Sequence, residues 1–269
     1  MAAAGESAAG RAEGAALGEG TLYVIPGSHA CAAAKLMLER KGIGYRTVEL
    51  PTGLHPQLVR LRGFAGSSEP MRMVDGRPTR MTAMLDRFGT VPALSLGSEK
   101  VQRNPQIARF LDRIAPAPAL FPVDPEQRAA VEDAESWGDE PLQMFARRLV
   151  IAASARDLGE MSERGAAGRL GALLAGNAPQ RMLAAKIAAR TTFRANADAE
   201  RRLLAELPAM LDRADGYLAA GVIGGEEPNV ADLMIAPSLA LLDYRLDIRD
   251  QVRARPAFDV VERLLPEPA

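Results

Sequence analysis

The chain has 269 residues, and 33 Lys and Arg against 34 Asp and Glu give a formal net charge of −1. This balance argues against a general nucleic-acid-binding protein, because affinity for the phosphate backbone requires a surplus of clustered Lys and Arg. A composition of 48% hydrophobic and 25% charged residues is typical of a soluble globular protein. No stretch approaches the roughly 18 apolar residues that cross a bilayer, so we expect no membrane span.

Cysteine and histidine are scarce. Cys31 is the single cysteine, so the chain forms no internal disulfide and no cysteine-rich zinc site, and we expect a reducing, cytoplasmic compartment. The two histidines, His29 and His55, are too few for a histidine-built centre, and no metal is predicted.

The Ala- and Gly-rich residues 1–20 have no apolar face to bury, so they are predicted to be a disordered tail. Residues 22–25 form a short apolar run that stops at a Pro-Gly pair, which predicts a buried strand. Ser28 then stands at the N-cap of a helix over residues 29–41. A second strand over residues 45–50 completes a strand–helix–strand unit, which suggests a parallel crossover.

A short helix is expected over residues 57–61, and residues 63–87 have no clean period and are interpreted as an insertion. An apolar strand that begins near Pro92 and a short returning strand over residues 100–102 form a hairpin. A helix over residues 105–113 follows. The order β-α-β then β-β-α predicts a thioredoxin-like α/β domain over residues 21–115.

The Pro-rich residues 116–125 predict a linker. Residues 126–269 are helical almost throughout, so we expect an all-α domain. Its first helix, over residues 126–151, should bend near Gly138 and Pro141, because proline removes one ladder hydrogen bond. Further helices are predicted over residues 181–194, 198–219 and 258–265, and after the capping pair Asn229 and Asp232.

Four motifs together suggest a family. They are Leu22-Tyr23-x-x-Pro26-x-Ser28-x-x-Cys31, Gly89-x-Val91-Pro92-x-Leu94, Asn229-x-Ala231-Asp232 and Arg255-Pro256-Ala257-Phe258. In this order and spacing the chain resembles the cytosolic glutathione transferase superfamily across about residues 21–265. The resemblance implies a thioredoxin-like N-terminal domain followed by an all-α C-terminal domain, glutathione as co-substrate, and a homodimer.

The resemblance gives Ser28 the catalytic position. The family's chemistry needs a glutathione thiolate at neutral pH, whereas a free thiol has a pKa of about 8.5. A hydroxyl donor and the positive end of a helix both favour the anion. Lys35 aligns with the family's basic residue on the same helix. The alternative is that Ser28 only caps the helix.

The resemblance also implies positions that hold the tripeptide. Val91 would bind the cysteinyl part through its backbone, and a cis Pro92 would turn those backbone groups outward. Where the family usually has Glu or Gln followed by Ser, this chain has Arg103 and Asn104. Asn104 suits a carboxylate beside a helix N-terminus. Arg103 would repel the glutamyl ammonium, and it could grip a carboxylate instead.

Residues next to Ser28 have open roles. Residues 28–31 occupy the place of a redox C-x-x-C whose first cysteine is replaced, which excludes a dithiol mechanism, and Cys31 is expected to pack inward. His29 is a candidate to contact a ligand carboxylate, with an exposed first-turn position as the alternative. His55 is expected at the surface.

Two patterns in the helical half bear on its role: an aromatic stripe with two possible interpretations, and an Arg-rich run. The stripe of Trp137, Met144, Phe145 and Arg148 matches the family's electrophile pocket, with plain core as the alternative. The Arg-rich run over residues 245–255 alternates with acids and predicts a solvated face.

The sequence therefore predicts an enzyme in which a glutathione thiolate, favoured by Ser28, attacks a small hydrophobic electrophile or a peroxide. No nucleic acid, membrane or metal is expected as a partner. One alternative is a non-catalytic binding or interaction protein with a degenerate glutathione site, which Arg103 and residues 63–87 favour. Another is an enzyme that uses Ser28 or Cys31 with a different thiol or an acidic ligand.

Overall fold

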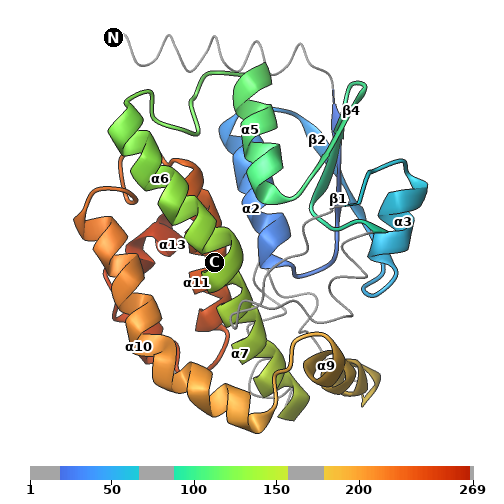
Figure 1. Cartoon of the computed structure of the whole chain (residues 1–269), viewed down its shortest axis with the longest axis vertical. Coiled ribbons are helices and arrows are strands. Elements are labelled where there is room, and N and C mark those ends of the chain that lie inside the picture. The colour runs from blue at the N-terminus through green and yellow to red at the C-terminus, as the bar shows by residue number, and fades with distance from the viewer. Residues whose placement is uncertain (1–18, 67–87, 157–178, 267–269) are drawn as a thin grey trace.

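The computed structural model describes residues 19–66, 88–156 and 179–266. Figure 1 shows a small sheet with helices beside a larger group of helices. Residues 1–18 of the predicted tail and residues 67–87 of the predicted insertion lie outside the described residues.

The sheet has four strands in the order β2-β1-β3-β4. The strands are β1 (Gly20–Val24), β2 (Tyr45–Glu49), β3 (Ala93–Leu96) and β4 (Glu99–Gln102). Strands β1 and β2 are parallel, whereas β3 runs antiparallel to both β1 and β4. The predicted parallel crossover is confirmed, and helix α2 (His29–Arg40) makes it.

Helices α2, α3 (His55–Leu61) and α5 (Asn104–Ile114) complete the α/β half. Helix α2 is Ala- and Leu-rich and almost wholly buried, because it packs on the sheet and also against α11 of the helical half. Its position is therefore fixed by both halves of the molecule.

A buried lysine joins the α/β half to the linker. Lys41, fully buried at the end of α2, donates from Nζ to Asp112 Oδ1 at 2.6 Å. The same nitrogen donates to the carbonyls of Ala115 at 2.6 Å and Pro118 at 2.7 Å. These three acceptors satisfy the ammonium and fix the start of the linker.

The helical half begins with one long helix that is interrupted once. Its parts are α6 (Pro125–Trp137), a π-helical turn η1 (Gly138–Leu142) and α7 (Gln143–Arg156). The helix is interrupted at the residues where a bend was predicted, and Pro141 lies inside the π turn. A Cβ atom at Gly138 would lie 3.1 Å from the Ile235 side chain, so the absence of a side chain there allows close packing.

The remaining helices are α9 (Pro179–Thr191), α10 (Ala197–Ala219), α11 (Val230–Asp243), α12 (Arg249–Arg253) and α13 (Phe258–Leu264). The predicted capping box is confirmed, since Asn229 and Asp232 each accept from the other's backbone N–H at the start of α11. Helix α12 was not predicted. No helix in the described ranges combines the length and apolarity needed to cross a membrane.

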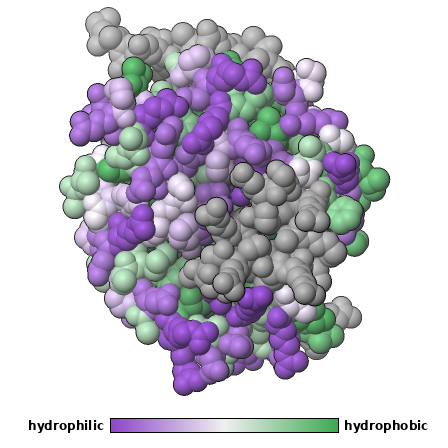
Figure 2. Space-filling model, in the orientation of Figure 1, coloured by the Kyte–Doolittle hydropathy of each residue, from purple (hydrophilic) through white to green (hydrophobic). Residues whose placement is uncertain are grey.

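The main hydrophobic core runs through both halves, from Leu22 in β1 to Val261 in α13. Hydrophilic residues cover most of the described helical face in Figure 2. The stripe of Trp137, Met144 and Phe145 is at most 3% exposed, which supports its interpretation as core.

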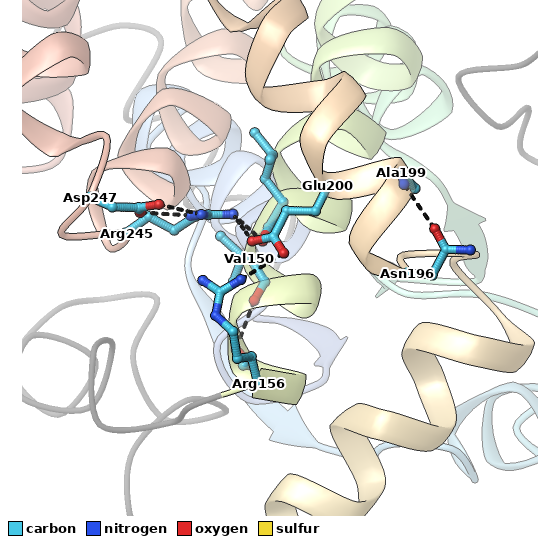
Figure 3. Close-up of polar contacts among 9 residues, drawn as sticks. Val150, Arg156, Asn196, Ala199, Glu200, Arg245 and Asp247 are labelled. Carbon is cyan, nitrogen blue, oxygen red and sulfur yellow. Dashed lines mark hydrogen bonds and ion pairs between the residues drawn. The ribbon is translucent and has the colours of Figure 1, made fainter.

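An ionic group, here termed the Arg245 cluster, consists of the buried Glu200 and Arg245 and the exposed Arg156 and Asp247 (Figure 3). Arg245 is 1% exposed and donates to Glu200 Oε1 at 2.8 Å and to the Leu149 carbonyl at 3.0 Å. Glu200 also accepts from Arg156 at 2.7 Å. The predicted solvated face is therefore wrong at Arg245, because Glu200 and the Leu149 carbonyl belong to helices that are distant in sequence.

Candidate functional site

The sheet topology gathers the predicted site residues at one edge. Strand β1 ends where the antiparallel β3 begins, with Tyr23 opposite Ala93. The backbone N–H of Arg103 donates to the Pro92 carbonyl at 3.0 Å, which places the β4–α5 turn at the same edge. The residues that meet there, here termed the edge residues, are Ser28, His29, Val91, Pro92, Arg103 and Asn104.

Ser28 is the N-cap of α2, as predicted. It has extended backbone angles, and its Oγ accepts from the Cys31 N–H at 3.3 Å. A hydroxyl has one donor and two acceptor sites, and capping uses only an acceptor site. The Ser28 side chain also hydrogen-bonds to the Cys31 thiol. The side chain is partly exposed and lines a groove of about 300 Å³ together with Lys35 and Tyr45. Val91 and Pro92 do not line this groove.

The peptide bond between Val91 and Pro92 is cis, as the resemblance implied. The β1–β3 ladder starts at Ala93, so Val91 lies just before it. Its side chain is 9% exposed and belongs to the core. The role of Val91 and Pro92 in holding a peptide stays a prediction.

Asn104 is more constrained than the sequence suggested. It is 2% exposed, and its Nδ2 donates to the Ala30 carbonyl in the first turn of α2 at 2.9 Å. A carbonyl only accepts, so the amide nitrogen must face it, and Oδ1 is then the buried atom without a partner. Asn104 thus ties the start of α5 to the start of α2.

Arg103 has a partner that the sequence did not reveal. It precedes α5 with a φ of 70°, a left-handed backbone uncommon for a residue other than glycine. Its side chain is 16% exposed and forms an ion pair with Glu140 of η1 at 3.8 Å. The charge that would repel an ammonium group is therefore partly balanced by the helical half.

His29 is buried, at 3% exposure, so the exposed first-turn alternative is wrong. Burial and the nearby charge of Arg147 lower its pKa well below the usual value, while a hydrogen bond to the Gln143 backbone opposes this shift. The imidazole is therefore neutral at pH 7. Its Nε2 is buried without a partner.

His55 and Cys31 are also less exposed than surface groups. Burial and Arg147 lower the pKa of His55 to about 4, and its Nδ1 is buried without a partner. The residue is half-buried, so the predicted surface position is met only in part. Cys31 is 2% exposed, and burial raises the pKa of its thiol. The predicted inward packing of Cys31 is confirmed.

Asp139 was not singled out from the sequence as a site residue. It is 6% exposed in η1, and burial raises its pKa to about 7, although Arg103 and Arg147 oppose the shift. A proline inside a long helix was the available signal, since π turns often occur at functional sites. Within the described ranges, no group of three or more His, Cys, Asp or Glu could hold a metal ion.

Neither a protein-family model nor a curated protein matches the chain. Solved structures do match it. A GST-like protein from Pseudomonas syringae is 21% identical with a TM-score of 0.55, over 91% of this chain and 66% of its own. The chain has the glutathione transferase fold. It thus spans just under two thirds of the Pseudomonas protein.

Two fungal glutathione transferases extend the comparison. A glutathione S-transferase of Ceriporiopsis subvermispora, solved in complex with glutathione, is 16% identical with a TM-score of 0.56, over 91% of this chain and 94% of its own. Glutathione transferase Omega 3C from Trametes versicolor is 16% identical with a TM-score of 0.53, over 96% of this chain and 90% of its own. These likenesses confirm the predicted fold, a thioredoxin-like domain followed by a helical domain.

Proposed function

We propose that this protein binds glutathione and activates its thiol at Ser28 for attack on a small hydrophobic electrophile or a peroxide. The position of Ser28 carries the proposal: a hydroxyl at the start of a twelve-residue helix, on the same sheet edge as a cis Val91–Pro92 bond. A structure of the same fold contains glutathione.

Ser28 would need to lower the pKa of the glutathione thiol only slightly. Its hydroxyl proton would donate to the sulfur, and the positive end of α2 would favour the anion. One charge-assisted hydrogen bond suffices to lower a thiol pKa by about one unit, which corresponds to about 1.4 kcal/mol. In the conjugation, the carbon–sulfur bond forms, the leaving group departs with its bonding electrons, and the thiol proton goes to solvent.

The other edge residues would position the tripeptide. Val91 would pair with its cysteinyl backbone like an added strand, next to the cis Pro92. Asn104 would act through α2, because its amide already holds the Ala30 carbonyl. A homodimer and a cytoplasmic location belong to the same proposal.

The test combines calorimetry and kinetics. Glutathione should bind with a millimolar or tighter dissociation constant, and Ser28→Ala should lower conjugation of a model electrophile by about tenfold. Ser28→Asp separates the two roles of the hydroxyl, because aspartate still caps the helix but cannot donate to sulfur. Ser98→Ala, in the exposed turn between β3 and β4, is the control. Unchanged turnover in Ser28→Ala would remove Ser28 from the mechanism.

A second candidate is a glutathione transferase-like binding protein without catalysis. Arg103 at the predicted glutamyl position and the engaged amide of Asn104 favour it. The same calorimetry decides between the two, because this candidate predicts no heat of binding with glutathione.

A further inference from the structure

The groove that Ser28 lines, here termed the α2 groove, has a volume of about 300 Å³. Ser28 belongs to its wall, whereas Val91, Pro92, Arg103 and Asn104 lie outside it. The α2 groove is therefore space beside Ser28 that the proposed backbone contacts to glutathione do not use. Its volume is at the lower end of the range for ligand pockets, about 300–1,000 Å³, so it suits a small molecule.

Helix α2 and strand β2 form two walls of the α2 groove. On the helix, Ser28, Lys35 and Glu39 lie along one face, because intervals of seven and four residues return to the same side of a helix. On the strand, Tyr45 is the first residue and Glu49 the last. Polar side chains therefore face the groove from both walls.

The strand register orders these side chains along the groove. Glu49 pairs with the last residue of β1, and the turn that leads to Ser28 follows directly, so Glu49 lies at the Ser28 end. At the other end the Tyr45 hydroxyl donates to Glu39 Oε1 at 3.2 Å and joins the two walls. Lys35 lies between these ends, about two helical turns beyond Ser28.

The α2 groove contains two charges of opposite sign that are not paired with each other. Lys35 is half-buried and Glu49 is exposed. Neither forms a hydrogen bond or an ion pair with any residue in the part of the chain that the structure describes. Because binding sites match the charges of their ligands, this arrangement fits a molecule that carries both signs close together.

Apolar groups form much of the remaining surface of the α2 groove. Ile25 and Leu265 line it and pack against the main hydrophobic core, which fixes their positions. Pro26 and Ala32 line it as well. An apolar group on the ligand would be stabilised here by about 25 cal/mol for each Å² of apolar surface that it buries.

We propose that the α2 groove binds the head group of an α-amino acid, with the ligand's carboxylate on the Lys35 ammonium and its ammonium on the Glu49 carboxylate. The apolar surface favours an apolar side chain. Two sources supply such a head group, a free amino acid and the glutamyl end of glutathione. The site requires no activation of a thiol at Ser28, so it goes beyond the proposed function.

The test titrates the full chain by calorimetry with L-phenylalanine and with two analogues that each lack one charge. Phenylalanine should bind with a millimolar or tighter dissociation constant. L-Phenylalaninamide, which lacks the carboxylate, should bind about tenfold more weakly, the loss expected for one charge-assisted hydrogen bond. N-Acetyl-L-phenylalanine, which lacks the ammonium, should bind about fivefold more weakly, since the exposed Glu49 is screened by solvent.

Variants of the two charged residues assign each charge of the ligand. Lys35→Gln should weaken phenylalanine binding by about tenfold and leave binding of the amide within about twofold. Glu49→Gln should weaken phenylalanine binding by about fivefold and leave binding of the acetyl analogue within about twofold. Lys186→Gln, exposed on α9, and Glu206→Gln, exposed on α10, are the matched controls.

Titration with S-methylglutathione separates the two sources of the head group. If Lys35→Gln weakens its binding as it weakens that of phenylalanine, the glutamyl end of glutathione uses the α2 groove. If only phenylalanine is affected, the ligand is a free amino acid.

Three results would overturn the proposal: no heat of binding with either phenylalanine or S-methylglutathione, no loss of binding for either ligand in Lys35→Gln, or an analogue lacking one charge that binds as tightly as phenylalanine. Equal losses for phenylalanine and both analogues in a variant would also reject it, because they would indicate a general structural change. Turnover of an electrophile enters none of these measurements, so a failure of the proposed function is observed separately.

Discussion

The Arg245 cluster and the edge residues are both polar regions inside the protein, but they are satisfied differently. Arg245 is 1% exposed, and its guanidinium is paired with Glu200, Asp247 and a backbone carbonyl. At the sheet edge, His29 and Asn104 are as deeply buried, yet each keeps one polar atom without a partner. Buried polar groups with partners hold helices together. Buried polar atoms without a protein partner are those to which a ligand would hydrogen-bond.

Loss of an ion pair in the Arg245 cluster should have the largest effect on the free energy of unfolding. Arg245→Ala leaves the buried Glu200 with Arg156 as its remaining arginine partner, and removing one member of a buried ion pair costs about 3–5 kcal/mol. We expect this loss in the free energy of unfolding measured with urea. Arg201→Ala, whose side chain is 78% exposed on the same helix as Glu200, should change it by less than about 0.5 kcal/mol. Similar losses in both variants would contradict the structural role of the Arg245 cluster.

The π turn η1, which meets the edge residues through the Arg103–Glu140 ion pair, should instead gain stability when its buried carboxyl group is neutralised. Burial raises the pKa of Asp139 to about 7, so the folded protein keeps a proton that the unfolded chain releases above about pH 4. The free energy of unfolding of the wild type therefore falls as pH rises from about 4 to 7.

In the Asp139→Asn variant this side chain carries no charge at any pH. Its free energy of unfolding therefore lacks the fall between about pH 4 and pH 7. Its advantage over the wild type should grow with pH to about 4 kcal/mol near pH 7. Urea unfolding at several pH values measures it, with the exposed Asp259→Asn as the control. A constant difference across the pH range would show that Asp139 ionises normally.

A smaller effect, on the affinity for glutathione, is expected from a substitution of Arg103. If its charge repels the glutathione ammonium, Arg103→Glu should tighten glutathione binding by about threefold, since a partly exposed charge contributes about 0.2–1 kcal/mol. Calorimetry measures the change, and Arg113→Glu, exposed on the helix α5 that follows Arg103, is the control. Weaker binding in Arg103→Glu would mean that Arg103 holds a glutathione carboxylate.

Local patterns in the sequence were sufficient for much of the fold. The strand, the Ser28 cap and the helix that follows depend on neighbours in the chain, and so does the capping box at Asn229. These features are confirmed. The interruption of the helix at Pro141 was predictable for the same reason, because proline acts on its own turn.

The failures share one physical cause. Arg245 was predicted to be solvated and His29 was left with an exposed alternative, but both are buried by helices that lie far away in the sequence. The ion pair between Arg103 and Glu140 joins the two halves in the same way. Composition and periodicity do not indicate which charged residue meets which partner across a domain boundary.

The most direct test of the account is the pKa of the glutathione thiol when bound, followed by the ultraviolet absorbance of the thiolate in a pH titration. In the wild type the pKa should lie at least about one unit below that of free glutathione, and Ser28→Ala should restore most of the difference. A bound thiol that titrates like free glutathione would contradict the account.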